Sequence, residues 1–296
     1  MCTSTTQRKQ GIKLRGYKAY RAASLRTPEY LCIDHAAISG IARRSAWPAQ
    51  ASAQTELSTD AVAWAREVLG FIADEKQQQV LAATGTRGIL NCTRQWGKST
   101  TCAIKSVHYA HFHPNSLVIV ASPTLRQSGE FLRKARKAVA QLGIRPRGDG
   151  ENRCSLLLPN GARIVGLPES EDTVRGFSDV GLMIIDEASR VSDELYTALR
   201  PMLAVGNGAL WLMSTPNGRS GFFYREWAGE TPWLRVQATA AECPRIGADF
   251  LREEQFTLGD EAYRQEYCCE FVCAEGALFD EAQIRARLTS NLEALW

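Results

Sequence analysis

Short apolar runs alternate with stretches of helical periodicity over most of this chain. Four runs are apolar at nearly every position, namely residues 89–92, 116–122, 181–186 and 209–214. A strand that is buried on both faces of a sheet has this continuous pattern, whereas a half-exposed strand alternates between apolar and polar residues. A further run at residues 233–239 predicts another strand.

The spacing of apolar residues between these runs predicts helices. A Ser-Thr-Asp group at residues 58–60 precedes apolar residues at helical spacing, so a helix is expected to begin there. Residues 74–83 continue as a second helix, and further helices are predicted at about 98–112 and 128–142. Strands that alternate with helices favour an α/β fold, in which helices cover both faces of a parallel sheet.

One pair of strands has a different kind of connection. Asn160-Gly161 lies between two apolar runs, and this dipeptide is a strong signal for a β-hairpin because tight hairpin turns need positive φ angles. The predicted fold is therefore α/β, with a mainly parallel central sheet flanked by helices, plus a β-hairpin. In such sheets ligands bind at the carboxyl ends of the strands.

Composition narrows the class of protein. The chain has 296 residues, of which 45% are hydrophobic and 23% charged, so we expect one large α/β domain with appendages. No apolar run is long enough to span a bilayer, and the first residues lack the apolar segment of a secretory signal. The nine cysteines are odd in number and scattered, which favours reduced thiols in the cytoplasm.

Positive charge is concentrated near the amino terminus. The net charge is only +3, yet residues 1–50 hold nine Lys and Arg against two acids. A basic arm on a nearly neutral body is typical of proteins that bind a polyanion. The alternative is a solvated tail without a function of its own. Residues 1–58 are expected to form this arm, weakly structured or helical.

A phosphate-binding loop is the first candidate for chemistry. Gly97, Lys98 and Ser99 match its Gly-Lys-Ser/Thr end, but Cys92 replaces the leading glycine. A strand precedes the segment and a helix follows it, which is the context that such a loop requires. Gly97 would permit close approach of the backbone, Lys98 would bind the β- and γ-phosphates, and the Ser99 hydroxyl would ligate Mg²⁺. The alternative is a chance Gly-Lys-Ser on a surface turn.

Polar residues follow two other buried strands. Asp186 and Glu187 come directly after one of them, where Asp186 can hold Mg²⁺ and Glu187 can deprotonate an attacking water. The alternative is an acid pair at a helix amino terminus. Thr215 and Asn217 follow the other strand and can sense a γ-phosphate. Three strands with such ends are far less probable by chance than one, so the loop is interpreted as a nucleotide site.

These motifs, in this order, resemble the ATPase domain of the large terminase subunit of tailed bacteriophages. The matching segments are CTRQWGKST, GLMIIDEA and STPNG, and the Arg94-Gln95 pair is similar to the deviant phosphate loop of that family. The resemblance runs from about Asp74 to Phe279. It implies a P-loop NTPase of the ASCE type, with ATP and Mg²⁺ as cofactors.

The resemblance also implies roles for individual residues. Arg94 would sense charge in cis, and Arg175 would be an arginine finger for the ATP of the next subunit; the alternative for Arg175 is a structural arginine. Gln77 would contact adenine, although Gln78 and Gln79 leave its register open, and the alternative is an exposed glutamine. The residues expected to bind nucleotide are Gln77, Cys92, Thr93, Arg94, Gln95, Trp96, Gly97, Lys98, Ser99, Thr100, Thr215 and Asn217. The expected catalytic residues are Glu187, Arg94, Lys98 and Arg175, and the expected metal ligands are Ser99 and Asp186.

The family comparison further implies a domain organisation and partners. Residues 59–275 would be the ATPase domain, and residues 276–296 would begin a linker toward a nuclease that this sequence is not expected to contain. The expected function is ATP hydrolysis that drives packaging of viral double-stranded DNA in the host cytoplasm. Implied partners are that DNA, the portal protein, the small terminase subunit and further copies in a ring. Alternatives are a catalytically silent prophage remnant that binds DNA or a capsid partner, and a helicase-like DNA translocase.

Overall fold

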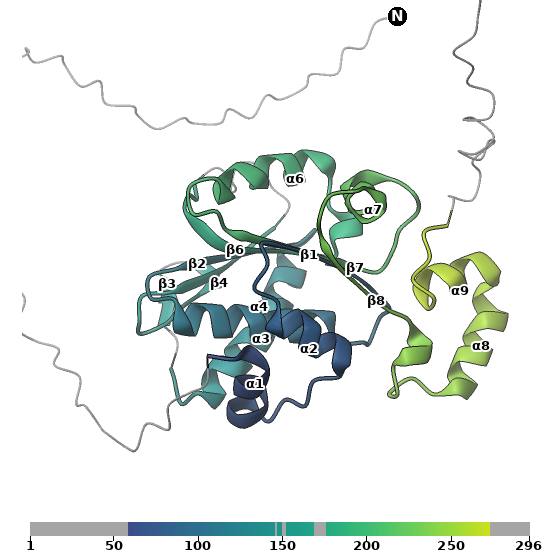
Figure 1. Ribbon diagram of the computed structural model, residues 1–296, viewed down its shortest axis with the longest axis horizontal. Coiled ribbons are helices and arrows are strands. Elements are labelled where there is room, and N and C mark those ends of the chain that lie inside the picture. Colours follow the sequence, from purple (N-terminus) through teal and green to yellow (C-terminus); the bar gives the residue numbers. More distant parts are fainter. Residues whose placement is uncertain (1–58, 146, 150–151, 169–175, 273–296) are drawn as a thin grey trace, which may run out of the picture. The chain divides into compact units, whose positions relative to one another are not determined.

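The computed structural model describes residues 59–145, 147–149, 152–168 and 176–272 (Figure 1). Within them, eight strands form one sheet in the order β3-β4-β5-β2-β6-β7-β1-β8. The strands are β1 (Arg87–Cys92), β2 (Leu117–Ala121), β3 (Arg147–Asp149), β4 (Asn152–Leu157), β5 (Arg163–Leu167), β6 (Val180–Asp186), β7 (Ala209–Ser214) and β8 (Leu234–Ala238).

Parallel pairing dominates this sheet, as the sequence predicts. The neighbours from β5 through β2, β6, β7 and β1 to β8 are all parallel, and only the β3–β4 and β4–β5 pairs are antiparallel. Strand β7 lies between β1 and β6. The carboxyl ends of these three strands therefore meet at one edge of the sheet, and the residues that follow them become neighbours.

The predicted β-hairpin is formed by β4 and β5. Its turn is closed by backbone hydrogen bonds from Leu158 N to Ala162 O at 2.9 Å and from Gly161 N to Leu158 O at 3.0 Å. Gly161 has φ of 82°, and the Asn115 side chain occupies the space where a Cβ atom of residue 161 would lie. Glycine is thus required at this position by both backbone conformation and packing.

Helices cover both faces of the sheet, and Figure 1 shows α1 to α4 on one side and α6 and α7 on the other. Each face buries its own apolar cluster: Trp64, Leu90 and Phe131 belong to one, and Ile89, Tyr196 and Phe222 to the other. The α-helices are α1 (Ala61–Leu69), α2 (Glu75–Ala82), α3 (Lys98–Phe112), α4 (Leu125–Gln141), α6 (Asp193–Leu199), α7 (Gly221–Ala228), α8 (Ala248–Leu258) and α9 (Asp260–Glu266). The 3₁₀ helices are η2 (Ala188–Arg190), η3 (Arg200–Leu203) and η4 (Ala240–Glu242).

The first two helices begin at aspartate caps. The Asp60 side chain accepts a hydrogen bond from Val62 N at 2.9 Å at the start of α1. At the start of α2, Asp74 accepts from Gln77 N at 2.8 Å while the Gln77 side chain accepts from Asp74 N at 3.1 Å. This reciprocal capping box satisfies two amide groups that a helix end otherwise leaves unpaired.

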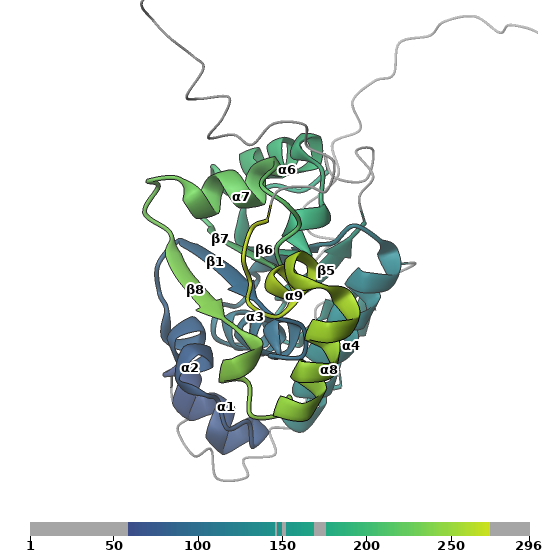
Figure 2. The same ribbon diagram turned by 90° about the vertical axis from the view of Figure 1, so that its right-hand side faces the viewer.

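The last described helices, α8 and α9, lie beside the end of β8 (Figure 2). The end of α9 and the residues after it are attached to the sheet by hydrogen bonds. Asn91 Nδ2 on β1 donates to Cys269 O at 2.8 Å, and Ala240 N donates to Tyr267 O at 2.8 Å. This attachment brings the carboxyl end of α9 to the edge of the sheet where β1 ends.

No helix in the described part of the chain is both long and apolar enough to cross a membrane.

A partly buried histidine predicts acid sensitivity. His108 on α3 packs against Trp64, with ring centroids 5.2 Å apart, and its Nε2 has no hydrogen-bond partner among the described residues. Burial lowers the pKa of His108 to about 4, below that of an exposed histidine. The unfolded chain therefore binds more protons between pH 6.5 and 4, so stability falls as the pH drops through this window, by about 1–2 kcal/mol when partial exposure is allowed for.

We expect His108→Phe to weaken this loss of stability between pH 7 and pH 4.5, as measured by urea unfolding at each pH. The quantity compared between wild type and His108→Phe is the change in unfolding free energy between the two pH values. A packing cost of the substitution that is the same at both pH values therefore cancels. His113→Gln is the matched control, because His113 is an exposed histidine at the end of the same helix. An identical pH dependence in wild type and His108→Phe would contradict the assignment.

Candidate functional site

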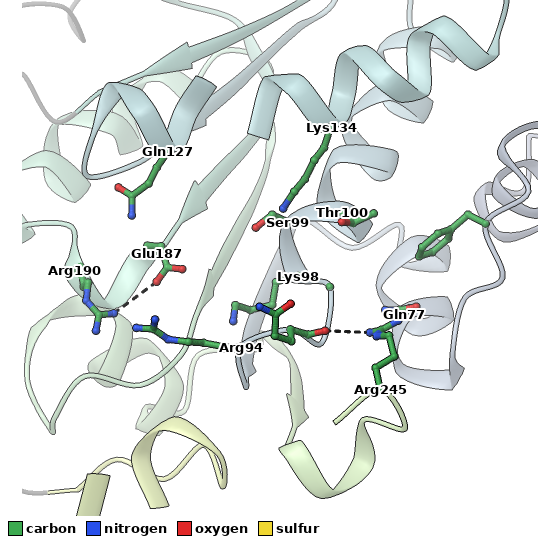
Figure 3. Close-up of a pocket in the computed structure, with 13 residues that line it drawn as sticks. Gln77, Arg94, Lys98, Ser99, Thr100, Gln127, Lys134, Glu187, Arg190 and Arg245 are labelled. Atoms are coloured by element: carbon green, nitrogen blue, oxygen red, sulfur yellow. Dashed lines mark hydrogen bonds and ion pairs between the residues drawn. The ribbon is translucent and has the colours of Figure 1, made fainter. Parts of the chain in front are cut away.

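A cavity of about 620 Å³ lies where β1 and β6 end, between the loop that follows β1 and helix α4 (Figure 3). Seven of the residues predicted to bind nucleotide line it: Gln77, Arg94, Gln95, Gly97, Lys98, Ser99 and Thr100. Glu187, which was predicted as a catalytic residue, lines it as well. The structure therefore brings together segments that are far apart in the sequence, as the convergence of strand ends predicts.

The loop after β1 turns sharply at two positions with left-handed backbone conformation. Gln95 has φ of 67° and Gly97 has φ of 105°. Gly97 directly precedes α3, so the loop delivers the amino terminus of that helix to the cavity. The partial positive charge and unpaired amide groups at a helix amino terminus favour an anion such as phosphate.

Lys98 is buried at the base of the loop. Its ammonium group donates to Cys92 O at 2.8 Å, to Thr93 O at 3.1 Å and to Thr215 Oγ1 at 3.2 Å. Thr215, which follows β7, in turn donates to Cys92 O at 3.2 Å. All three acceptors are neutral oxygens. They hold the Lys98 ammonium group in place, and none of them is a carboxylate that would neutralise its charge.

Ser99 and Asp186, the two predicted metal ligands, lie next to each other. Ser99 Oγ lies 3.4 Å from Asp186 Oδ2. Burial, together with the neighbouring Glu187 carboxylate, raises the pKa of Asp186 to about 6. A buried carboxyl group with a raised pKa favours a cation beside it, because a positive charge restores the ionised form.

Glu187 has an unusual backbone conformation for a residue with a side chain. Its φ of 52° and ψ of 43° are left-handed, and the turn is held by the bond from Glu187 N to Asp186 Oδ1 at 3.0 Å. Such strain is common at functional sites, where surrounding structure maintains it. The Glu187 side chain lines the cavity, and its Oε2 lies 3.7 Å from Arg190 Nη1 (Figure 3).

Of the three consecutive glutamines on α2, Gln77 alone lines the cavity. Gln78 and Gln79 are exposed, whereas Gln77 is buried and its Nε2 donates to Trp96 O at 3.0 Å. The sequence left the register of these glutamines open, and Gln77 is the one that the structure places beside the loop. Both ends of its amide group have partners within the protein, so Gln77 braces the loop after β1 from α2.

Other predicted site residues do not line the cavity. Cys92 and Trp96 have buried side chains that pack in the core, and the Thr93 hydroxyl donates to Glu266 O at 2.9 Å. Thr93 N donates to Ala238 O at 2.9 Å, which extends the pairing with β8. Asn217 is exposed and is not among the residues that line the cavity. The predicted arginine finger, Arg175, lies outside the described residues.

Comparison with known proteins is consistent with this geometry. The model of a protein family described as "Terminase large subunit, T4likevirus-type, N-terminal" matches residues 89–286. The chain belongs to the terminase large subunit family. The resemblance to large terminase subunits that the three motifs indicated is thereby confirmed.

Individual terminases are similar to this chain over more than half of its length. The large terminase subunit of Escherichia phage T5 is 26% identical over 176 residues, which are 56% of this chain and 40% of that protein. The large terminase ATPase domain of Thermus phage P74-26 is 22% identical with a TM-score of 0.61, over 70% of this chain and 97% of that one. The large terminase of another thermophilic bacteriophage, solved in complex with ADP, is 15% identical with a TM-score of 0.56, over 67% of this chain and 53% of that one.

These likenesses confirm the predicted α/β fold, in which helices flank a mainly parallel central sheet. The chain spans less than half of the length of the T5 terminase subunit.

Five residues that line the cavity were not predicted as site residues: Phe71, Gln127, Lys134, Arg190 and Arg245. Lys134 lies on the basic helix α4 and points toward Ser99 (Figure 3), so its helix was predicted but its direction was not. Arg245 follows η4 and donates to Gln95 O at 3.2 Å and to Trp96 O at 2.5 Å. No terminase motif marks Arg245, because it reaches the loop from 149 residues further along the chain.

Proposed function

We propose that this chain is the motor part of a terminase large subunit, which hydrolyses ATP to move double-stranded viral DNA into a capsid. By this proposal its partners are the DNA, the portal protein, the small terminase subunit and further copies of itself in a ring. The host cytoplasm is where it acts. Membership of the family supports the proposal.

The observation that carries the proposal is that Lys98 and Ser99 line one cavity and that Asp186 lies directly behind it, in contact with Ser99. Lys98 and Ser99 begin α3, directly after the loop that follows β1, and Asp186 ends β6. The Ser99 hydroxyl and Asp186 carboxylate oxygens are 3.4 Å apart. Phosphoryl transfer needs little covalent chemistry from the protein, so catalysis rests on positioned charges of this kind.

Magnesium suits the donor set of this site. Mg²⁺ prefers oxygen ligands at 2.0–2.1 Å in octahedral geometry, which sets neighbouring ligands about 3 Å apart. It is usually held by one or two carboxylates together with phosphates and water. Ser99 and Asp186 would hold the ion, which would supply positive charge between the β- and γ-phosphates. No group of three or more His, Cys, Asp and Glu suited to another metal occurs among the described residues.

Each residue around the phosphates would have its own role in hydrolysis. Lys98 and Arg94 would stabilise negative charge on the transferred phosphoryl group, and Glu187 would orient the water and accept its proton. Thr215 would report loss of the γ-phosphate through its contact with Lys98, and Asn217 stays a predicted second sensor. Arg175 would complete the site of the neighbouring subunit.

The remaining predicted contacts concern the nucleotide base and the loop. Gln77 would lie next to adenine, and the similarity to a terminase that was solved with ADP supports a nucleotide there. Cys92, Thr93 and Trp96 would act by shaping the loop, while Gln95, Gly97 and Thr100 would face the phosphates directly.

A hydrolysis assay tests the proposal. We expect phosphate release that requires ATP and Mg²⁺ and increases when double-stranded DNA is added. Because the finger residue comes from a neighbouring subunit, activity per mole is expected to rise with protein concentration. Absence of hydrolysis with DNA binding retained would instead support the silent remnant. Equal stimulation by single-stranded DNA would favour the helicase-like alternative.

A further inference from the structure

Arg94, Glu187 and Arg190 line the cavity. Glu266, at the carboxyl end of α9, lies behind them and is in reach of both arginines. Glu266 Oε2 accepts a hydrogen bond from Arg94 Nε at 2.8 Å, and its Oε1 lies 4.0 Å from Arg190 Nη2. Arg190 Nη1 in turn lies 3.7 Å from Glu187 Oε2. One carboxylate from a distant helix thus contacts both arginines that line the cavity near the proposed catalytic base.

The position of Glu266 is fixed by the backbone around it. Its carbonyl oxygen accepts from the Thr93 hydroxyl at 2.9 Å, so the residue is bound to the phosphate loop through both its backbone and its side chain. The next residue, Tyr267, is bound to η4 through the bond from Ala240 N. The Glu266 side chain is only 22% exposed. This carboxylate is therefore held in place and is not a mobile surface group.

The way in which Arg94 is held bears on catalysis. A guanidinium group has five N–H donors, and its two terminal nitrogens form the fork that matches a phosphate group. Glu266 takes the single Nε donor, which leaves the terminal nitrogens unused by any other contact among the described residues. With a side chain that is 63% exposed, Arg94 has little else to restrict it. The carboxylate also offsets repulsion between Arg94 and Arg190.

We propose that Glu266 is a positioning residue for ATP hydrolysis, which holds Arg94 by its Nε so that the terminal nitrogens remain available to the γ-phosphate. This inference rests on the proposed function of the cavity. It assigns a part in the reaction to α9, a helix that carries none of the recognised motifs.

The test is a double-mutant cycle between Glu266 and Arg94 in single-turnover hydrolysis, together with steady-state kcat and KM. We expect Glu266→Ala to lower kcat on the order of 10-fold, the loss that follows removal of an outer partner of a functional side chain. KM for ATP and the thermal midpoint are expected to stay close to wild type. In an Arg94→Ala background the same change is expected to cost less than about twofold, because coupled residues are not additive.

Two further variants separate positioning from a structural role. Glu266→Gln keeps an oxygen that accepts from Arg94 Nε, so it is expected to recover most of the activity that Glu266→Ala loses. Glu270→Ala is the matched control, because Glu270 accepts from Arg264 Nε at 2.9 Å just beyond α9. This control removes a similar ion pair away from the cavity and is expected to leave kcat unchanged.

Three outcomes would overturn the proposal. They are a wild-type rate in Glu266→Ala, a loss of the same size in the Arg94→Ala background, and a loss in Glu270→Ala as large as that in Glu266→Ala. Failure of the wild-type protein to hydrolyse ATP would overturn the proposed function itself, and this inference with it. The wild-type rate therefore distinguishes the two failures.

Discussion

Lys98→Ala is expected to abolish ATP turnover. The ammonium group is buried beneath the phosphate loop, where its three acceptors are neutral oxygens of Cys92, Thr93 and Thr215. Removing one preorganised charge-stabilising donor of this kind costs about 10²–10³-fold in rate. Since Lys98 is also expected to bind the ground-state triphosphate, affinity and turnover should fall together. Phosphate release and equilibrium binding of a fluorescent ATP analogue measure the two effects.

The control for this experiment must remove a lysine without touching the cavity. Lys137→Ala serves, because Lys137 is an exposed residue on α4 that does not line the nucleotide cavity. Thermal unfolding of Lys98→Ala should remain cooperative, since Thr215 Oγ1 still donates to Cys92 O. Near-normal hydrolysis by a folded Lys98→Ala protein would exclude the loop as the phosphate site.

Glu187→Gln is expected to separate binding from chemistry. The amide has the shape of the carboxylate but cannot accept the proton of the attacking water, and general base catalysis contributes about 10²–10⁴-fold. The residue does not hold the phosphate loop, so ATP affinity is expected to stay within a few-fold of wild type. A single-turnover assay measures hydrolysis apart from product release, and equilibrium binding measures affinity.

Glu194→Gln is the matched control for Glu187→Gln. Glu194 is an exposed glutamate in the first turn of α6, only a short distance further along the chain. Its change is expected to leave both rate and affinity unaltered. A single-turnover rate for Glu187→Gln equal to that of wild type would remove this residue from the role of base.

Much of the fold could be predicted because local sequence signals agree with it. The expected helix at 98–112 corresponds to α3, Lys98–Phe112. The boundaries of α4 were less accurate, because the helix begins at Leu125 after the Thr124 cap rather than near residue 128. Thr124 accepts from Gln127 N at 3.3 Å, a contact that apolar periodicity does not reveal.

The candidate site was predicted only in part, for a physical reason. Segments with a strand, a polar end and a following helix can be recognised from nearby residues. Lys134, Arg245 and Glu266 carry no such local mark, since each lies on a helix or loop whose direction is decided by packing. Trp96 was predicted as a site residue because it lies inside the loop motif. Its side chain instead packs in the hydrophobic core.

By itself the sequence determined the class of fold, the glycine-containing loop at the end of β1 and the acids at the end of β6. These features depend on periodicity and on neighbouring residues, which a linear chain already contains. Only the tertiary structure decided that β7 lies between those strands and that Ser99 meets Asp186 across 87 residues. It also decided that Glu266 reaches Arg94 across 172 residues. Strand order and helix docking are set by burial of two apolar faces at once, and no local segment of sequence specifies that balance.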